Sequence, residues 1–585
     1  MSLTAEPSGR SGDSLEIPDD TDFFRAPSTM ELHRSGPWPL LTPSTVAYLC
    51  EKEKSGAAMG VQSRAGPSSM AAKSGSDPVP ASDPRGGVGR GEDPPLRSTA
   101  RVFAAALLLV AACFPSTSSS DADRSHGTSP ISILLVGDIM LGRGVAPIAA
   151  GDPAGLFEDV RLIVESADLS LANLESPLTD RAHRSANPNT LEADPALASV
   201  IAGAGFDLLT LANNHIGDAG PGGVIDTIAA VEGAGMVAAG AGADSDTANR
   251  PVLLEVGDLT VAVLAFDATG AGLPAGSSPG VATWETETAR VAVVEAARQS
   301  DIVVVAVHGG VEYLPEPDPR MMAIAEQLAG WGVDIVWGQG AHVVQPVTFL
   351  ADGGGRGAVV ATSLGNFLFD QRGPLTGRGA VLEVLADDKG VIAYRVGPTS
   401  HHDLRVDFEE WELPSGDAAL IDGEWWTLVR APATISDRSA DVPDFEWGIV
   451  VSASTGRITG SDDEETVVAF RHLPGSHPVR DGLPDIDWVG VSGMSAHLGI
   501  YRSDDLAPIW VAGMVPAPIS KVAACDGAVA LAYSTLDSPE VTGTGAAVWR
   551  PFGLDGVARL PGPGTPMCAD VDGDELTEAV ITGRS

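Results

Sequence analysis

The chain has 585 residues, which is too long for one ordinary domain and predicts about two to four. Its 78 acidic residues outnumber 36 basic ones, and the formal net charge of −42 argues against nucleic acid and anionic lipid as electrostatic partners. The cysteines, Cys50, Cys113, Cys525 and Cys568, are too few for a disulfide scaffold and show no Cys-x-x-Cys zinc spacing.

The first segment, residues 1–96, is rich in Ser, Gly, Pro and Asp and has no helical or strand period. We interpret it as disordered or as an over-extended N-terminus, because it holds too little apolar surface to offset the entropy of ordering. Residues 97–130 resemble a lipoprotein-like signal and linker, with a basic start and an apolar run from Val102 to Cys113. That run is too short to span a bilayer, and it ends in a sequence that resembles the box whose cysteine is lipidated.

A signal of this kind belongs near the start of a precursor. We therefore expect translation to begin downstream, for example near Met70, and the mature protein to be extracytoplasmic, either secreted or anchored in the cell membrane by a lipid at Cys113. The alternative is that the apolar run is a short buried helix. Export to an oxidising compartment would also make a disulfide between Cys525 and Cys568 chemically possible.

Residues 131–399 alternate strand-like and helix-like segments at the spacing typical of α/β domains. The strand-like runs are 131–136, 168–173, 206–212, 252–256, 259–266, 302–307, 334–337 and 359–362. The helical patterns cover 222–232, 285–298 and 318–331. The runs at 252–256 and 259–266 predict a hairpin around Gly257-Asp258.

Polar side chains recur just past the ends of these runs. They are Asp138, Glu175, Asn214, His215, His308, His342 and Asn366. Any one of them alone is ordinary turn chemistry or a hydrogen-bonded structural residue. If the strands share one sheet, however, these side chains converge on one edge, and their carboxylates, imidazoles and amide oxygens together suit a divalent transition metal. A metal there would polarise a phosphoryl or acyl oxygen and acidify water, and His215 is placed to donate a proton to a leaving group.

The same region resembles a known family, the CapA or poly-γ-glutamate capsule biosynthesis proteins. The matching stretches are Gly137-Asp-Ile-Met-Leu-Gly-Arg143, Asn173-Leu-Glu175, Leu211-Ala-Asn-Asn-His215 with Asp218, Gly240-Ala-Gly followed by Arg250-Pro251, His308-Gly-Gly-Val-Glu-Tyr313, His342-Val-Val-Gln-Pro346 and Ser363-Leu-Gly-Asn-Phe367. Their order agrees across the region, and together they are far more specific than any one motif alone.

The resemblance implies an α/β fold: a four-layered α/β/β/α sandwich like that of the calcineurin-like metallophosphoesterases, followed here by a β-rich domain. It also implies a divalent metal, Mn, Fe or Zn. The implied ligands are Asp138, Glu175, Asn214, His308 and His342. His215 would be the catalytic acid with Asp218 close by, and Arg143 would touch an anionic substrate.

The chain departs from the family pattern at two places that bear on the metal. Met140 stands where the wider metallophosphoesterase pattern has a histidine, a change that CapA proteins generally share. In the loop before His342, Gly340 replaces the first imidazole of the family's usual pair, and Gly309 stands where the family tends to have Trp. These departures favour one bound ion over two, or a cleft that binds a polymer without cutting it.

Residues 405–585 hold many short apolar runs separated by Gly, Pro and Asp, which predicts a β-rich C-terminal domain. Near the end stands an acidic glycine turn with Asp570, Asp572, Asp574 and Glu578. Alternate carboxylates of this kind fit an oxygen-ligated Ca²⁺ loop, and the stretch resembles the FG-GAP type of calcium loop. Residues 460–465 repeat its Gly-to-Glu interval without the leading carboxylates. A solvated acidic turn is the alternative.

Three functions stay open. The first is synthesis, export or trimming of an extracellular polymer such as poly-γ-glutamate by metal-assisted hydrolysis or transfer, beside membrane-bound synthesis proteins. The second is a phosphoesterase acting on a small or lipid-linked phosphate. The third is a non-catalytic polymer-binding or assembly factor, which Gly340 favours. Because the chain is so acidic, we expect any anionic polymer to be engaged locally, through cations or metal.

Overall fold

The structure is a computed structural model that describes residues 128–181, 190–351, 356–432, 435–436, 438–442, 445, 448–461, 463–472, 495–512, 517–535, 540–551, 553–574 and 576–584. The predicted disordered segment and the predicted signal with Cys113 lie outside the described residues, so both stay predictions. Within the described ranges, no helix is long and apolar enough to cross a membrane.

The first sheet is built around β1 (Ile131–Ile139). Its neighbours on one side, all parallel to it, are β2 (Leu169–Leu174), β3 (Leu208–Thr210) and β4 (Val237–Ala239). On the other side, β14 (Arg378–Asp387) pairs antiparallel with β1, and β15 (Gly390–Ser400) pairs antiparallel with β14. The short β13 (Asn366–Leu368) runs parallel to the end of β1.

Asp138 lies within β1, whereas the sequence pattern placed it in a turn after the strand. The reason is that Asn173 of β2 and Asn366 of β13 pair with Asp138 from both sides and extend the ladder. The preceding Gly137 allows this pairing, because a Cβ at that position would collide with the carbonyl oxygen of Gly365. The carboxylate of Asp138 is therefore held by strand pairing on both sides.

The second sheet has the order β11-β12-β10-β9-β7-β6. Its strands are β6 (Val252–Val256), β7 (Leu259–Asp267), β9 (Ile302–His308), β10 (Ile335–Gln339), β11 (Val347–Ala351) and β12 (Gly357–Ala361). β6 and β7 form the predicted hairpin, and β7, β9, β10 and β12 run parallel. The polar strand ends therefore come from two sheets, as the resemblance implied, and they do not depend on the strands sharing one sheet.

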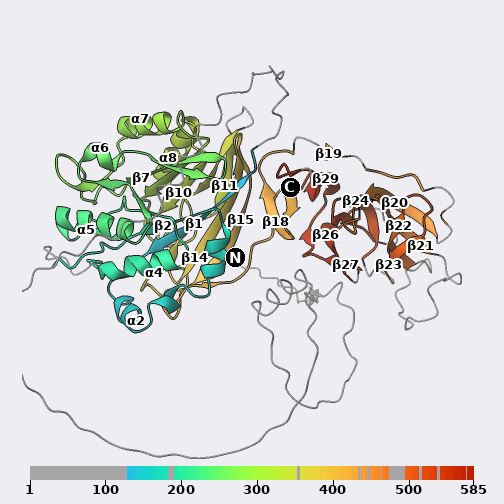
Figure 1. The fold of residues 1–585 in the computed structure, drawn as a ribbon, viewed down its shortest axis with the longest axis horizontal. Helices are drawn as coiled ribbons and strands as arrows, with labels where there is room; N and C mark the ends of the chain where they lie inside the picture. The colour runs from blue at the N-terminus through green and yellow to red at the C-terminus, as the bar shows by residue number, and fades with distance from the viewer. Residues whose placement is uncertain are drawn as a thin grey trace, which may run out of the picture. The chain divides into compact units, whose positions relative to one another are not determined.

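Helices cover the face of each sheet that points away from the other sheet (Figure 1). The elements packed on the first sheet are α2 (Ala146–Gly151), η1 (Ala154–Leu156), α3 (Arg161–Ser166), η2 (Pro195–Leu197), α4 (Ala198–Gly203) and α5 (Gly220–Gly233). Those packed on the second sheet are α6 (Ser245–Ala248), α7 (Thr286–Ala296) and α8 (Pro319–Gly330). The small ribbon of β5 (Ala241–Gly242) and β8 (Gly280–Val281) completes this region.

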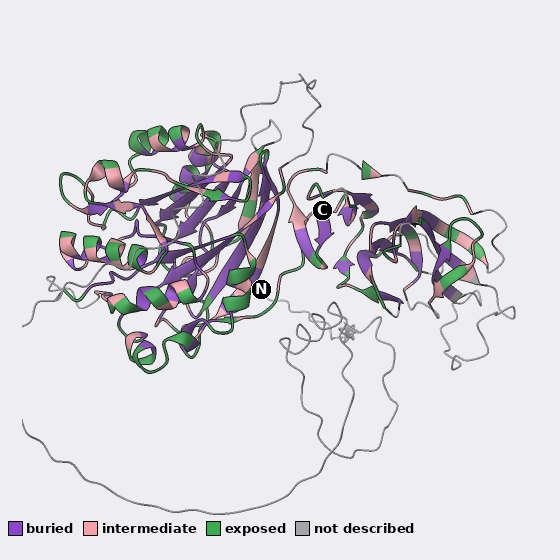
Figure 2. Cartoon of the chain, in the orientation of Figure 1, coloured by how far each residue is buried: buried purple, intermediate pink, exposed green. Residues whose placement is uncertain are grey.

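Alternate residues of the central strands serve different cores, which explains their unbroken apolar sequence. In β1, Leu134 packs with the helices, while Ile133 and Leu135 pack against the second sheet. In β9, Val304 faces the first sheet and Val305 faces the helices. A strand with both faces buried needs apolar residues at every position, because successive side chains point to opposite faces. Figure 2 shows both sheets as mainly buried.

The chain beyond residue 400 is β-rich, as predicted. One antiparallel sheet contains β20 (Ile449–Gly456), β21 (Glu465–His472), β22 (Ser495–Arg502) and β23 (Pro508–Val511). Another contains β24 (Ile519–Ala524), β25 (Ala528–Tyr533), β26 (Gly543–Arg550), β27 (Gly553–Gly556) and β28 (Leu560–Pro561). The other strands extend the first sheet, and they are β16 (Asp407–Phe408), β17 (Ala418–Ile421), β18 (Glu424–Leu428), β19 (Ile435–Ser436), β29 (Thr565–Ala569) and β30 (Glu578–Thr582).

Cys525 and Cys568 form a disulfide, which the sequence had indicated as chemically possible. Their Cα atoms are 5.4 Å apart, a separation typical of disulfides. Both sulfurs are buried in an apolar cluster that includes Trp425 and Ile581. Cys525 directly follows β24 and Cys568 lies in β29, so the bond connects a C-terminal sheet to the extension of the first sheet.

Reduction of this disulfide should destabilise the C-terminal strands. The bond spans 43 residues, and closing a loop of that size restricts the unfolded chain by an amount worth about 4 kcal/mol in the chain-entropy model. We expect urea unfolding, followed by tryptophan fluorescence, to move to a lower midpoint in dithiothreitol. The double variant Cys525→Ala/Cys568→Ala should show the lower midpoint with or without dithiothreitol. Equal midpoints for oxidised and reduced wild type would contradict the prediction.

Candidate metal centre

Asp138 provides the first carboxylate of a buried polar group at the carboxyl ends of β1 and β2. Its Oδ1 accepts a hydrogen bond from Asn173 Nδ2 (2.8 Å), and its Oδ2 accepts one from the backbone N–H of Gly340 (3.3 Å). The Nδ1 atom of His342 lies 3.3 Å from the same Oδ2. Burial raises the pKa of Asp138, but the hydrogen bond with His342 and the charge of His308 outweigh it, so the pKa falls and the group stays ionised.

Glu175 provides the second carboxylate. It follows β2 and is 1% exposed, and neither side-chain oxygen has a hydrogen-bond partner among the described residues. Three imidazoles face its Oε1 through their Nε2 atoms: His308 at 3.7 Å, and His215 and His342 at 3.9 Å. Burial is the main reason that the pKa of Glu175 is raised. A buried carboxylate without hydrogen bonds is costly, which indicates that a cation belongs beside it.

His342 provides the nitrogen. It follows β10 in the left-handed backbone region (φ 58°) and is 6% exposed. Its Nδ1 lies 2.9 Å from Asn366 Oδ1, so the Nε2 atom faces Glu175. Burial lowers its pKa, but the Glu175 charge and the Asp138 hydrogen bond outweigh burial and raise it to about 10.

Asp138, Glu175 and His342 each offer one ligand atom, and these atoms all lie within 4.8 Å of one another. Two carboxylate oxygens and one imidazole nitrogen suit a divalent transition metal, and the unpartnered oxygens of Glu175 are free to ligate it. The residues present therefore fit a metal ion. Of the ligands predicted for residues 131–399, these are the ones that the structure brings into a single compact group.

Asn214 and His308 are the other ligands predicted for this region, and His308 lies beside the group, 3.7 Å from Glu175 Oε1. The Oδ1 atom of Asn214 is buried and finds no donor in the described part of the chain, so it is open to a ligand. The neighbouring Asn213 is structural, because its Nδ2 donates to the carbonyl oxygen of Leu174 (2.8 Å). The His308 Nδ1 atom lies 3.4 Å from Asn173 Nδ2, so that amide occupies one of its nitrogens.

Gly340 stands where the family pattern has its first imidazole, and the structure shows what occupies that space. Its φ is +95°, in the left-handed region that favours glycine. A Cβ at this position would lie 2.9 Å from His308 Nε2, so the space beside it is filled by His308. The backbone therefore fits no imidazole at this position unless His308 moves.

His215 and Asp218 form a pair beside Glu175. The His215 Nδ1 atom lies 2.9 Å from Asp218 Oδ2, which also accepts from the backbone N–H of Leu191 (3.0 Å). Burial lowers the pKa of His215, but the Asp218 hydrogen bond and the charges of Glu175 and Asp218 outweigh burial and raise the pKa above its ordinary value. The imidazole is thus held as a proton donor with Nε2 facing the metal group.

The rim of the site carries Arg143, predicted to touch an anionic substrate. Its guanidinium binds Asp370 (Nε to Oδ2 3.1 Å) and lies 5.5 Å from the ring centre of Phe369. Sequence reasoning missed Asp370 and gave no role to Asn173, which fixes the Asp138 carboxylate. Asn173 belongs to a matched motif, and Asp370 follows the motif that ends at Phe367; these positions are the only signal that could have found them.

The predicted calcium loop is separate from this group. Carboxylate oxygens of Asp570, Asp572 and Asp574 lie within 4.8 Å of one another, and Asp574 is exposed. Glu578, predicted as a fourth ligand, lies outside this group, because its Oε2 accepts a hydrogen bond from the backbone N–H of Val571 (2.7 Å). Glu578 therefore holds the loop backbone in this structure.

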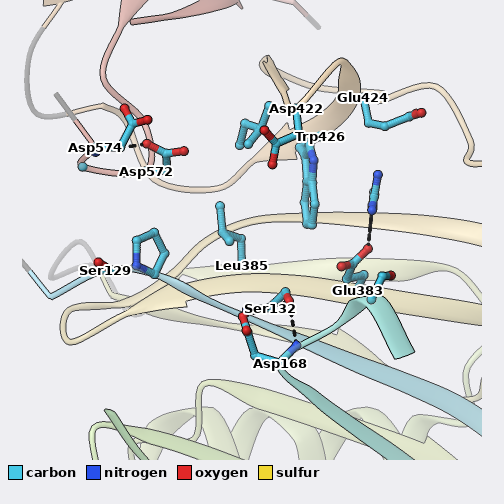
Figure 3. Close-up of a pocket in the computed structure, with 15 residues that line it drawn as sticks. Ser129, Ser132, Asp168, Glu383, Leu385, Asp422, Glu424, Trp426, Asp572 and Asp574 are labelled. Atoms are coloured by element: carbon cyan, nitrogen blue, oxygen red, sulfur yellow. Dashed lines mark hydrogen bonds and ion pairs between the residues drawn. The ribbon is translucent and has the colours of Figure 1, made fainter. Parts of the chain in front are cut away.

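Asp572 and Asp574 also line a cavity of about 420 Å³ (Figure 3). Its wall includes Asp168 and Glu383, with Arg395 paired to Glu383. Among the described residues, those lining this cavity include none of the Asp138, Glu175 and His342 group. The acidic cavity and the candidate metal centre are therefore distinct.

The family model described as "Bacterial capsule synthesis protein PGA_cap" matches residues 132–371. The chain is 30% identical over 286 residues to the PGA biosynthesis protein CapA of Bacillus subtilis (strain 168), which covers 48% of this chain and 74% of that protein. It is 31% identical over 305 residues to the capsule biosynthesis protein CapA of Bacillus anthracis, covering 50% and 73%. The crystal structure of a hypothetical protein from Thermus thermophilus aligns over 48% of this chain and 100% of its own, at 20% identity and a TM-score of 0.31, which is too low for a conclusion.

The matched residues include the Asp138, Glu175 and His342 group and end before the C-terminal strands. The FG-GAP resemblance of the last segment lies outside the match and stays a prediction. On the identity and coverage of its two CapA relatives, the chain belongs to the family of bacterial capsule synthesis proteins, PGA_cap.

Proposed function

We propose that this protein takes part in the synthesis, export or trimming of a capsule polymer by metal-assisted hydrolysis or transfer. The observation that carries the proposal is the Glu175 carboxylate, which is buried, lacks hydrogen bonds in the described structure and is faced by imidazoles. A cation held between Asp138, Glu175 and His342 would compensate its charge.

A divalent ion at this place supplies Lewis acidity toward an acyl or phosphoryl oxygen and lowers the pKa of a bound water. The chain's own residues orient the site. Asn366 accepts from His342 Nδ1 and so directs the Nε2 atom inward, as outer partners of metal-binding histidines commonly do. Asn214 offers a further oxygen, since its buried Oδ1 has no partner in the described ranges.

His215 is the proton donor in this proposal. Its Nδ1 is held by Asp218, which leaves the Nε2 proton facing the reacting region. Because its pKa is raised, the protonated imidazole is favoured, and it delivers that proton to a leaving group. Asp218 orients the ring and stabilises its positive charge.

The proposed substrate is an anionic extracellular polymer such as poly-γ-glutamate, because the two relatives carry PGA and capsule biosynthesis in their names. The net charge of −42 repels such a chain at a distance, so contact depends on local positive groups such as the metal and Arg143. Export, a lipid anchor at Cys113 and membrane-bound synthesis partners belong to the same proposal and are supported by the sequence alone.

The metallophosphoesterase-type sandwich is part of this proposal as well. Two sheets with helices on their outer faces, and polar strand ends from both sheets in one group, are the arrangement that such a fold requires. This leaves a phosphoesterase as an alternative chemistry for the same residues, which an aryl phosphate substrate would detect.

A second candidate function, a non-catalytic polymer-binding or assembly factor, is favoured by Gly340. The His308 ring fills the space beside Gly340, so one imidazole of the family pattern is lost and a two-metal centre is incomplete. The cleft would then bind the polymer through a single ion, or through Arg143, and leave it uncut.

Glu175→Gln and Asp138→Asn should abolish metal binding, because each removes the charge of a ligand while preserving its shape. We expect elemental analysis to find bound transition metal in wild type after incubation with Mn²⁺, Zn²⁺ or Fe²⁺, and little in either variant. Glu383→Gln is the matched control, since Glu383 is also buried but pairs with Arg395 in β15. Equal metal content in wild type and Glu175→Gln would contradict the assignment.

His215→Gln should lower turnover by about 10²–10⁴-fold with metal content unchanged, because it removes a general acid without touching a ligand. Asp218→Asn should cause a smaller loss, since the imidazole stays but is less well oriented. The assays are glutamate release from poly-γ-glutamate and hydrolysis of 4-nitrophenyl phosphate. If the variants lose activity only toward 4-nitrophenyl phosphate, the protein is a phosphoesterase. If wild type is inactive on both substrates, the protein is the binding factor.

A further inference from the structure

Backbone strain gathers at the candidate metal centre. In the described chain, the non-glycine residues with positive φ include Arg143 (40°), Tyr313 (66°) and His342 (58°), and all three surround this site. Bulky side chains rarely adopt this region, and such conformations persist where surrounding contacts require them. Tyr313 is 50% exposed, and nothing in the proposed chemistry yet uses it.

A hydrogen-bond chain of fixed direction connects His342 to Tyr313. Asn366 Nδ2 donates to Thr376 O (3.0 Å) and to Gln371 Oε1 (3.2 Å), so its Oδ1 is the acceptor for His342 Nδ1 (2.9 Å). Since Gln371 Oε1 accepts, its Nε2 donates to the Tyr313 hydroxyl oxygen (3.2 Å). Every donor therefore points outward, and the hydroxyl hydrogen of Tyr313 remains available to an acceptor beyond the chain.

The nearby charges also act on this hydroxyl. Burial raises the pKa of Tyr313, and so does the charge of Glu312, while the positive charge of Arg143 opposes them. Glu312 itself is exposed. The Tyr313 ring centre lies 6.1 Å from that of His342, which puts the tyrosine next to the candidate metal group.

We propose that the Tyr313 hydroxyl is a specificity-determining contact, which donates a hydrogen bond to a carboxylate of the substrate. Arg143 adds positive charge to the same place. The inference rests on the proposed function and narrows its substrate class to chains that carry carboxylates close to the reacting bond. The negative charge of the neighbouring Glu312 then repels the substrate carboxylate.

Two single variants should therefore change binding in opposite directions. The probe is an oligo-γ-glutamate, titrated calorimetrically into the full chain with Mn²⁺, beside the same oligomer with its side carboxylates amidated. Tyr313→Phe should weaken binding of the acidic oligomer by about tenfold, as expected for one hydrogen bond to a charged group. Glu312→Gln should strengthen it. Both variants should bind the amidated oligomer as wild type does.

Tyr394→Phe is the matched control, because it removes a hydroxyl from β15, outside this hydrogen-bond chain. The inference is wrong if Tyr313→Phe binds the acidic oligomer like wild type, or weakens both oligomers equally; the proposed function survives either result. A wild type that binds neither oligomer overturns both. Should Tyr313→Phe fail to fold, tighter binding by Glu312→Gln supports the inference and unchanged binding overturns it.

Discussion

The buried carboxylate of Glu175 is the constraint on which the candidate site depends. Three histidines from separate segments, His215, His308 and His342, present Nε2 to one oxygen of this carboxylate at 3.7 to 3.9 Å. Each contacts other side chains through Nδ1: Asp218, Asn173 and Asn366, respectively. The supporting partners thus decide where the imidazoles point.

These partners also give the histidines different roles. Asn173 donates from Nδ2 to Asp138, and its Oδ1 accepts from Thr210, so its amide orientation is fixed. The same Nδ2 faces His308 Nδ1, which then accepts, and the ring hydrogen lies on Nε2. For His342 the opposite holds, because Asn366 takes the hydrogen of Nδ1 and leaves Nε2 as the nitrogen that a metal would bind in place of a proton. His342 is therefore suited to a metal, and His308 to donating toward Glu175.

The sequence was enough to predict the strands and helices and much of the site, because both depend on the local pattern of apolar and polar residues. Unbroken apolar runs give strands buried on both faces, and polar residues after those runs give the site. It failed where long-range pairing decides the outcome. Asp138 stays inside its strand because two asparagines, separated in sequence by almost two hundred residues, flank it. The link from Asn366 through Gln371 to Tyr313 likewise exists only after the loops meet.

Gly340 shows why a missing motif residue has to be interpreted together with its neighbours. From the sequence, glycine at this position is simply a lost imidazole. In the structure the glycine has φ +95°, donates its N–H to Asp138 and leaves the space that His308 fills. A histidine introduced here would be strained and would collide with His308, so it would not restore a second ligand by itself. The imidazole is absent at Gly340 and His308 fills the same space, so the two observations have to be explained together. Asp138, Glu175 and His342 then remain as the compact set that suits a single ion.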